Sequence, residues 1–206
     1  MKAITRSAAN TTIRLARIED AEQIAAIYAP IVLNTPISFE AEPPDAGETA
    51  RRIETILAQY PWLVCEADGQ VAGYAYASRH RDRYHYQWSV DVTVYVNEQF
   101  HRNGIGTSLY TSLLAVVPLQ GYVGAFAGIT LPNAGSVGLH ESMGFMPVGI
   151  YKNVGFKLGS WHSVGWWQRP LQTLPVRPSL PIPLRDVLGT PAWEEGLQQG
   201  IDLLRV

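Results

Sequence analysis

The spacing of apolar residues along the chain predicts a domain built from both helices and strands. Segments 24–31 and 53–60 carry apolar side chains at intervals of three and four residues, the spacing of one helical face, and each ends before a proline. Asp68-Gly69 is a hairpin signal between the apolar runs 62–66 and 71–77. Further strands are expected at 13–16, 125–130, 146–151 and 163–168.

The segment 89–110, SVDVTVYVNEQFHRNGIGTSLY, is the most informative part of the chain. Its first part is rich in β-branched residues, which favour a strand. A turn with Gly104 and Gly106 follows, and glycine both tolerates positive φ and lets a ligand approach the backbone. Apolar residues at helical spacing continue over 107–117, so the turn opens a helix whose first N–H groups are unpaired. Such a helix start favours an anion, and a diphosphate suits it.

Three phosphate-binding motifs compete for this turn. A dinucleotide fingerprint requires a third glycine where Leu109 stands and an acidic ribose ligand about 20 residues further on, which makes that interpretation weak. A P-loop requires a lysine that Gly-Ile-Gly-Thr lacks. The turn resembles instead the Gln/Arg-x-x-Gly-x-Gly/Ala pattern of GNAT N-acetyltransferases, whose loop binds the pyrophosphate of acetyl-CoA, although His101 occupies the Gln/Arg position. A glycine turn without a ligand is the remaining alternative.

A second segment, 131–145, fits the same family. It is typical of a turn, a short helix and a glycine stop. It resembles the second GNAT signature, in which an Asn contacts the pantetheine arm and a residue at the position of His140 faces the thioester. Alternatively, His140 is a helix residue paired with a carbonyl. The resemblance implies that acetyl-CoA is the cosubstrate, bound by Val94, Tyr95, Val96, Arg102, Asn103, Gly104, Ile105, Gly106, Thr107, Asn133 and Ser136.

The resemblance narrows to acetyltransferases of phosphinothricin and of methionine sulfone or sulfoximine, and it covers roughly residues 13–171. The stretches that carry it include ISFE at 37–40, YPWLV at 60–64, YQW at 86–88 and GFK at 155–157. It implies a mixed α/β GNAT fold: a mostly antiparallel twisted sheet flanked by helices and splayed at the strand that carries the acetyl-CoA site. By position it assigns the amino-acid pocket to Phe39, Arg81, Arg83 and Tyr86.

The expected reaction is direct transfer of the acetyl group, in a ternary complex, to the α-amino group of such an amino-acid analogue. A protonated amine must first lose a proton, and Asp91 lies mid-strand among apolar residues where a carboxyl has no packing role. It stands where herbicide-detoxifying relatives carry a catalytic Glu, and its shorter side chain favours a water relay. His140 is the expected partner acid or base. The resemblance also implies an oxyanion donor in the amide of Tyr95 or Val96.

The basic segment 79–83 is the candidate anion clamp for the substrate. Guanidinium groups bind carboxylates or phosphinates bidentately, which suits Arg81 and Arg83 to that role. The alternative is a solvated basic loop. An acidic pocket would instead indicate another amine, such as a polyamine or a protein N-terminus, and loss of Asp91 or His140 would have indicated a non-catalytic CoA-binding module.

Composition is consistent with a compact enzyme. The chain has 206 residues, 47% of them hydrophobic, and a net charge of -2, which gives no electrostatic argument for nucleic acid. The single Cys65 lies in a strand-like run and is interpreted as a buried structural thiol, and no metal is expected. Residues 1–12 lack an apolar signal region and no stretch suits a membrane span, so a cytoplasmic protein is expected.

Residues 1–171 are expected to form the acetyltransferase domain and residues 172–206 a proline-rich extension. Thr190-Pro191 is typical of a helix start, and an apolar face follows at Trp193, Leu197, Ile201 and Leu204. We expect this extension to dock, and its own domain, a second subunit or no specific target remain the alternatives; the expected assembly is a homodimer.

One rival enzyme class is a hydrolase. Ala134-x-Ser136-x-Gly138 is close to a nucleophile elbow, Gly-x-Ser-x-Gly. Its first glycine is replaced by alanine, and no Asp followed by His comes later in the chain. Hydrolysis is therefore disfavoured.

Overall fold

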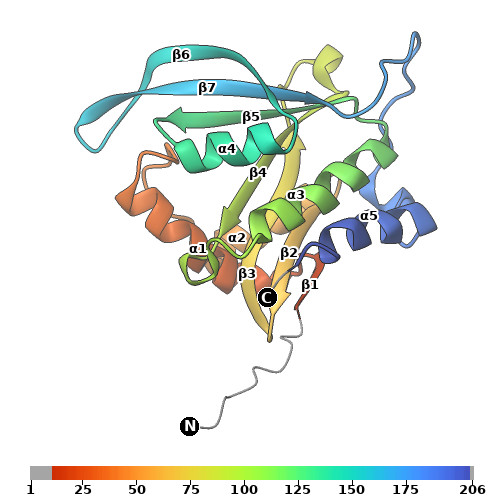
Figure 1. Ribbon diagram of the computed structural model, residues 1–206, viewed down its shortest axis with the longest axis horizontal. Helices are drawn as coiled ribbons and strands as arrows, with labels where there is room; N and C mark the ends of the chain where they lie inside the picture. Colours follow the sequence, from red (N-terminus) through yellow and green to blue (C-terminus); the bar gives the residue numbers. More distant parts are fainter. Residues whose placement is uncertain (1–10, 205–206) are drawn as a thin grey trace.

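The computed structural model describes residues 11–204, which form one seven-stranded sheet with helices on both faces (Figure 1). Its strands lie in the order β1-β2-β3-β4-β5-β7-β6, and every neighbouring pair is antiparallel except β4 and β5. The strands are β1 (Thr11–Leu15), β2 (Trp62–Ala67), β3 (Gln70–Arg79), β4 (Ser89–Val96), β5 (Gly124–Leu131), β6 (Met146–Lys157) and β7 (Ser160–Pro170). The predicted mixed α/β class with a mostly antiparallel sheet is confirmed.

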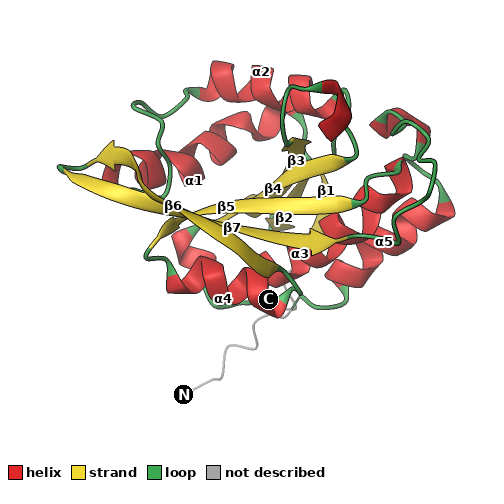
Figure 2. Cartoon of the chain, turned by 90° about the horizontal axis from the view of Figure 1, so that it is seen from above, coloured by secondary structure: helices red, strands yellow, loops and turns green. Residues whose placement is uncertain are grey.

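Two layers of helices cover the sheet (Figure 2). On one face lie α1 (Ala21–Asn34) and α2 (Ala46–Leu57), and on the other α3 (Ile105–Val116), α4 (Ala134–Ser142) and α5 (Pro191–Ile201). Short 3-10 helices occur at Ile18–Asp20, Tyr84–Tyr86, Glu98–Phe100, Val117–Gln120 and Leu184–Asp186. No helix within residues 11–204 combines the length and the apolar character that crossing a membrane requires.

The alternation of side chains along β2 divides the core into two clusters. Leu63 and Cys65 belong to the cluster beneath α3 and α5, whereas Val64 belongs to the cluster beneath α1 and α2. All three are fully buried. Because successive strand residues point to opposite faces, a strand covered on both sides must be apolar throughout, which explains the unbroken run at 62–65. Each such burial contributes about 1.5–3 kcal/mol.

β4 and β5 separate after three residue pairs. Their parallel pairing covers Ser89 with Gly124, Val90 with Ala125 and Asp91 with Phe126 and then ends. Beyond that point β4 stays paired with β3, and β5 stays paired with β7. Figure 1 shows the two strands diverging, with α4 beside the opening. The expected splay is confirmed, and it begins at the residue that sequence reasoning selected as the base.

The hairpin predicted at Asp68-Gly69 is confirmed, since both residues have positive φ, 48° and 80°. The last two strands are longer than expected: β6 continues to Lys157 and β7 begins at Ser160. The polar pair Lys152-Asn153 interrupts the apolar alternation, but a register shift between Tyr151 and Gly155 absorbs these extra residues and the pairing resumes.

The C-terminal segment docks on its own domain. Thr190 Oγ1 accepts a hydrogen bond from the Trp193 N–H at 3.2 Å, so the predicted cap is present. Trp193 and Leu197 are buried, and Ser112 Oγ on α3 donates to the Leu197 carbonyl at 2.8 Å. α5 therefore completes the core on the face that α3 covers.

Candidate active site

Asp91 lies where β4 and β5 part, and it faces a cavity of about 470 Å³. Its Oδ1 is 2.6 Å from Nδ1 of His80, which follows the end of β3. The His80 ring is stacked on Phe126, with ring centroids 4.3 Å apart. Burial raises the pKa of Asp91, while the hydrogen bond from His80 and the charge of Arg81 act in the opposite direction. The site thus holds a desolvated carboxylate with one imidazole partner.

A narrower slot of about 90 Å³ continues from this cavity into the splay. The slot is lined from β4 by Val94 and Tyr95 and from α4 by Asn133, Ser136 and His140. Five residues line both spaces: Ile37, Val92, Thr93, Gly128 and Thr130. The two spaces are therefore contiguous, and a group at the inner end of the slot lies beside the Asp91 cavity.

The turn before α3 presents free backbone N–H groups. Arg102 and Gly104 have positive φ, 65° and 78°, and the first helical hydrogen bond runs from the Ser108 N–H to the Gly104 carbonyl at 2.9 Å. Within residues 11–204, the N–H groups of 105–107 have no acceptor. Such a helix start binds anions. His101 occupies the position where the family pattern has Gln or Arg. Its Nε2 lies 3.0 Å from the Val96 carbonyl, and this contact connects the turn to the end of β4.

Asn133 and Ser136 begin α4 at the wall of the slot. Asn133 Oδ1 accepts from the Ser136 N–H at 3.1 Å as the helix cap, which leaves the Asn133 amide NH₂ available to a ligand. The hydrolase alternative fails here because Ser136 lies within this helix start, and its hydroxyl is 3.3 Å from His140 Nδ1 without a third member of a triad.

Both ring nitrogens of His140 are engaged. Nδ1 lies 2.7 Å from the Ser136 carbonyl and must carry the proton, so Nε2 accepts from the Tyr110 hydroxyl at 3.0 Å. Burial lowers the pKa of His140, which keeps the ring neutral. His140 thus lines the slot and also makes the carbonyl contact of the alternative interpretation.

The predicted substrate residues fall in two places. Phe39 lines the Asp91 cavity, the guanidinium of Arg81 lies 5.0 Å above the Trp166 ring that also lines it, and Tyr86 lies edge-on to His80 at 5.9 Å. Arg83 lines a separate hollow of about 650 Å³. Arg81 lines that hollow too, so it stands between the two spaces.

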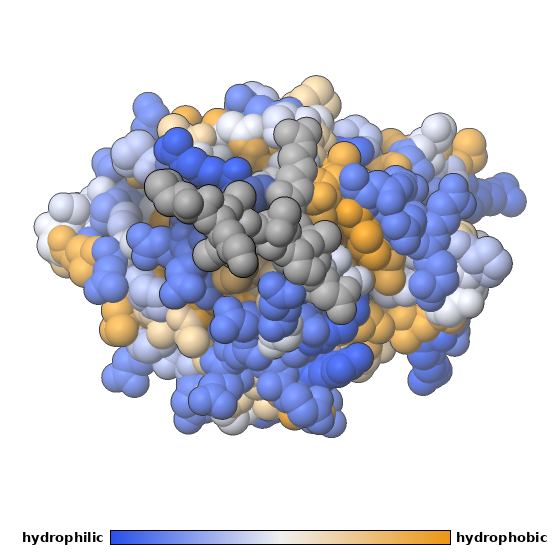
Figure 3. Space-filling model, turned by 60° about the horizontal axis from the view of Figure 1, so that its bottom comes forward, coloured by the Kyte–Doolittle hydropathy of each residue, from blue (hydrophilic) through white to orange (hydrophobic). Residues whose placement is uncertain are grey.

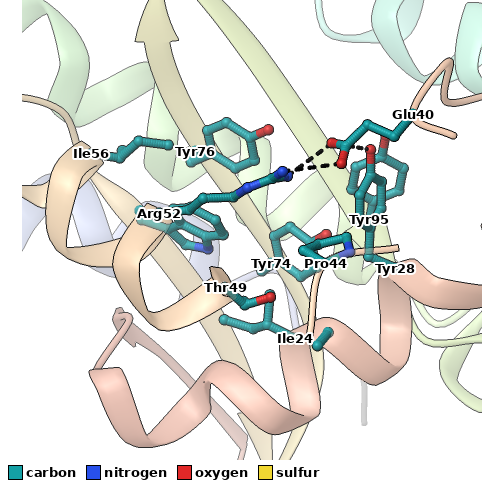
Figure 4. A pocket seen from close by; sticks show the side chains of 12 residues that line it. Ile24, Tyr28, Glu40, Pro44, Thr49, Arg52, Ile56, Tyr74, Tyr76 and Tyr95 are labelled. Carbon is teal, nitrogen blue, oxygen red and sulfur yellow. Dashed lines mark hydrogen bonds and ion pairs between the residues drawn. The ribbon is translucent and has the colours of Figure 1, made fainter. Parts of the chain in front are cut away.

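Figure 4 shows a neighbouring aromatic pocket that sequence reasoning did not find. Arg52 on α2 donates to Glu40 at 2.8 Å, and the Tyr28 hydroxyl donates to the same carboxylate at 3.0 Å. Burial raises the pKa of Tyr28 to about 12, so this hydroxyl stays protonated. Tyr95 lines both this pocket and the slot, and its ring lies 5.1 Å from that of Tyr28. The pocket thereby fixes the loop after α1 against β4.

His80 was not among the site residues predicted from the sequence. The register of two paired strands explains its position. The antiparallel pairing of β3 with β4 sets Ser78 opposite Asp91, so a residue just past the end of β3 comes within reach of the carboxylate. Burial raises the pKa of the Cys65 thiol to about 12, in keeping with the structural role expected for this residue. Within the described residues, no cluster of three His, Cys, Asp or Glu side chains could hold a metal ion.

A sheet opened between two parallel strands, with an anion-binding helix start beside the opening, defines an acyl-CoA-dependent transferase. Residues 13–166 match the family described as Acetyltransferase (GNAT) domain, and the chain belongs to this family of acetyl-CoA-dependent N-acetyltransferases. The free N–H groups, the Asn133 amide and the slot fit a pyrophosphate and a pantetheine arm, so the residues present suit acetyl-CoA.

Named relatives support the narrower resemblance. A phosphinothricin N-acetyltransferase of Streptomyces viridochromogenes is 40% identical over 170 residues, which cover 81% of this chain and 93% of that protein. An L-methionine sulfoximine/L-methionine sulfone acetyltransferase of Pseudomonas aeruginosa is 33% identical, covering 77% and 94%. The crystal structure of a phosphinothricin acetyltransferase from Sinorhizobium meliloti in complex with acetyl-CoA matches with a TM-score of 0.78 at 34% identity, covering 82% of this chain and 93% of that one.

Proposed function

We propose that this enzyme transfers the acetyl group of acetyl-CoA to the α-amino group of a small amino-acid analogue of the phosphinothricin, methionine sulfone or methionine sulfoximine type. The observation that carries the proposal is the continuity of the slot with the Asp91 cavity. A thioester at the inner end of the slot and an amine in the cavity would meet where β4 and β5 part. Both substrates therefore bind together, in a ternary complex.

The reaction needs one base. Asp91 accepts a proton from the substrate ammonium, directly or through one water, and the freed nitrogen pair attacks the thioester carbonyl carbon. The carbonyl electrons move to oxygen, and the amide N–H of Val96, which points away from β3, stabilises that oxyanion. When the intermediate collapses, the C–S bond breaks, the electron pair leaves with sulfur and the second amine proton neutralises the thiolate. His140 takes part through Tyr110, whose hydroxyl it orients at the slot.

The substrate's anionic end would lie toward Arg81 and the edge of Phe39. Among the described residues, Asp91 is the one charged residue that lines the cavity, whereas a polyamine with several ammonium groups would be expected to meet several carboxylates. Arg81 supplies the positive charge at the rim, and Arg83 adds to it from the adjoining hollow. One carboxylate in the cavity and two guanidinium groups near it favour an amino acid whose other end is anionic or strongly polar.

The proposed assembly is a homodimer through the β6–β7 hairpin, acting in the cytoplasm. Eight large apolar side chains are exposed on this hairpin, which extends beyond the body in Figure 1: Met146, Val148, Ile150, Tyr151, Val154, Phe156, Leu158 and Trp161. The face shown in Figure 3 has hydrophilic and hydrophobic residues interspersed around the part that grey atoms cover. Large apolar side chains that are exposed together on one hairpin indicate a protein–protein interface. Sedimentation of a Phe156→Glu/Trp161→Glu double variant as a monomer, with wild type as a dimer, would support the assembly; a monomeric wild type would exclude it.

Thiol release from acetyl-CoA tests the function. Purified enzyme is titrated with phosphinothricin, methionine sulfone, methionine sulfoximine, a polyamine and a short peptide. Saturable release with the three amino-acid analogues alone is expected. Release with the polyamine or peptide alone would reassign the amine, and binding of acetyl-CoA without release in any arm would identify a non-catalytic CoA-binding protein.

A further inference from the structure

His80 makes a polar contact with Asp91 in addition to its packing against aromatic rings. Its side chain is 10% exposed and contacts the rings of Phe126 and Trp166, which pack against the imidazole but offer no acceptor for its N–H. Its Nδ1 points at Asp91 Oδ1 from 2.6 Å, the length of a strong, charge-assisted hydrogen bond. The imidazole and the carboxylate therefore form a pair inside the cavity wall.

We propose that His80 is the positioning residue of the base: its Nδ1–H donates to Asp91 Oδ1, keeps the carboxylate ionised and leaves Oδ2 to the substrate ammonium. The inference rests on the proposed role of Asp91. The proton assignment follows from chemistry, because two acceptors cannot lie 2.6 Å apart unless one carries a proton, and an ionised Asp91 carries none. Within residues 11–204, His80 Nε2 makes no hydrogen bond, so no contact there opposes the Nδ1–H tautomer.

Two opposing effects explain why Asp91 needs this partner. Burial raises the pKa of the Asp91 carboxyl and so favours its protonated form, which cannot accept the ammonium proton. A donated hydrogen bond stabilises the ionised form and lowers the pKa again. In the proton transfer, the substrate N–H bond breaks and an Oδ2–H bond forms, while the His80 bond to Oδ1 stays in place.

Few other ionisable groups face Asp91. Arg81, on the same loop as His80, acts on its charge, and Tyr76 on β3 interacts with it weakly. Tyr86 contacts the His80 ring, and Phe126 on β5 and Trp166 on β7 carry no ionisable group. A shift in the pH profile after substitution of His80 is therefore assignable to the loss of its imidazole, and a substitute that keeps an N–H donor isolates the hydrogen bond.

The test compares kcat/KM from pH 5 to 9 for wild type, His80→Phe and His80→Asn, with acetyl-CoA and the best amino-acid substrate. Phenylalanine keeps the stack on Phe126 but has no donor, whereas asparagine places an N–H near the Nδ1 position. We expect His80→Phe to move the acid limb upward by about one to two pH units, the effect of a charge-assisted hydrogen bond. His80→Asn should retain most of the wild-type profile.

Identical acid limbs for wild type and His80→Phe would overturn the proposal. If His80→Phe does not fold, His80→Gln serves in its place, because its amide lies near the Nε2 position and cannot replace the Nδ1 donor; equal profiles of the Gln and Asn variants would again overturn it. Failure of the proposed function is recognised separately, since wild type would then release no thiol with amino acids, or Asp91→Asn would retain wild-type turnover.

Discussion

The backbone of Gly155 lies directly against the ring of Phe39. A Cβ at position 155 would overlap three atoms of that ring, and the ring lines the Asp91 cavity. Gly155→Ala is therefore expected to displace Phe39 and to raise the KM for the amino-acid substrate about 5- to 150-fold, the effect of about 1–3 kcal/mol of overpacking. The KM for acetyl-CoA should change little, because Phe39 does not line its slot.

Gly149→Ala is the matched control for this variant. Gly149 lies on the same strand, and a Cβ there would meet nothing within 4 Å. Steady-state kinetics with both substrates should leave Gly149→Ala at wild-type values. Equal effects of the two alanines would show that β6, and not the contact with Phe39, is responsible.

Lys157 joins the end of β6 to the loop that carries Phe39. Its ammonium donates to the carbonyls of Val32 and Ser38 at 2.6 Å each and to that of Glu40 at 3.1 Å. Lys157→Met keeps the aliphatic stem and removes all three bonds, so we expect a loss of about 2 kcal/mol in the free energy of unfolding and a raised KM for the amino acid. Urea unfolding measures the first, with exposed Lys152→Met as the control; a stable Lys157→Met with normal kinetics would refute the role.

Asp91→Asn should separate activity from stability. We expect turnover to fall roughly 100- to 10,000-fold with acetyl-CoA affinity nearly intact. Because burial raises the pKa of Asp91 above its value in the unfolded chain, its ionisation subtracts from stability at pH values above both pKa values. Asparagine lacks this cost, so Asp91→Asn should unfold at higher urea than wild type at pH 7–8, and the gain should shrink as acid protonates Asp91.

Turnover and urea unfolding together decide this prediction. Unchanged turnover would remove Asp91 from the mechanism. A variant that is less stable than wild type at pH 8 would show that the bond to His80 outweighs the burial of the charge.

Local signals predicted the acetyl-CoA side of the site, and long-range contacts supplied the rest. β-branched residues, the glycine turn and the Asn133 cap act within a few residues, so the strand, the anion-binding turn and α4 could be predicted from the sequence. The contact between Lys157 and Ser38 joins residues 119 positions apart, and no local pattern encodes it. The Asp91–His80 bond spans only 11 residues but depends on the register of β3 and β4.

The pocket for the amino-acid substrate was also harder to predict, because long-range contacts orient its side chains. Arg81 and Arg83 are two residues apart in one loop, and sequence alone treated them as one clamp. Both line the adjoining hollow, but only Arg81 also lies over Trp166, at the rim of the Asp91 cavity. The direction of a loop side chain is set by what packs against it, here an aromatic residue from the distant strand β7.

The two arginines should therefore contribute unequally. Arg81→Ala removes the guanidinium at the cavity rim and is expected to raise the KM for the amino acid about tenfold or more, with a much smaller effect on acetyl-CoA. Arg83→Ala should raise the same KM less. Arg177→Ala, an exposed change in the C-terminal segment, is the control. A proportional rise of both KM values in either variant would contradict binding of the substrate anion.

Gly200 allows α5 to approach α3 closely. A Cβ at this position would overlap the Ser108 carbonyl and the Ser112 hydroxyl of α3. Gly200→Ala gains helix propensity, yet it must push the helices apart, so we expect a net loss of about 1–3 kcal/mol in the free energy of unfolding.

Gly138→Ala in α4, where a Cβ would meet nothing within 4 Å, should instead stabilise by up to about 1 kcal/mol. Both are measured by urea unfolding; a Gly200→Ala protein as stable as wild type would show that the extension contributes little to the core despite its buried Trp193.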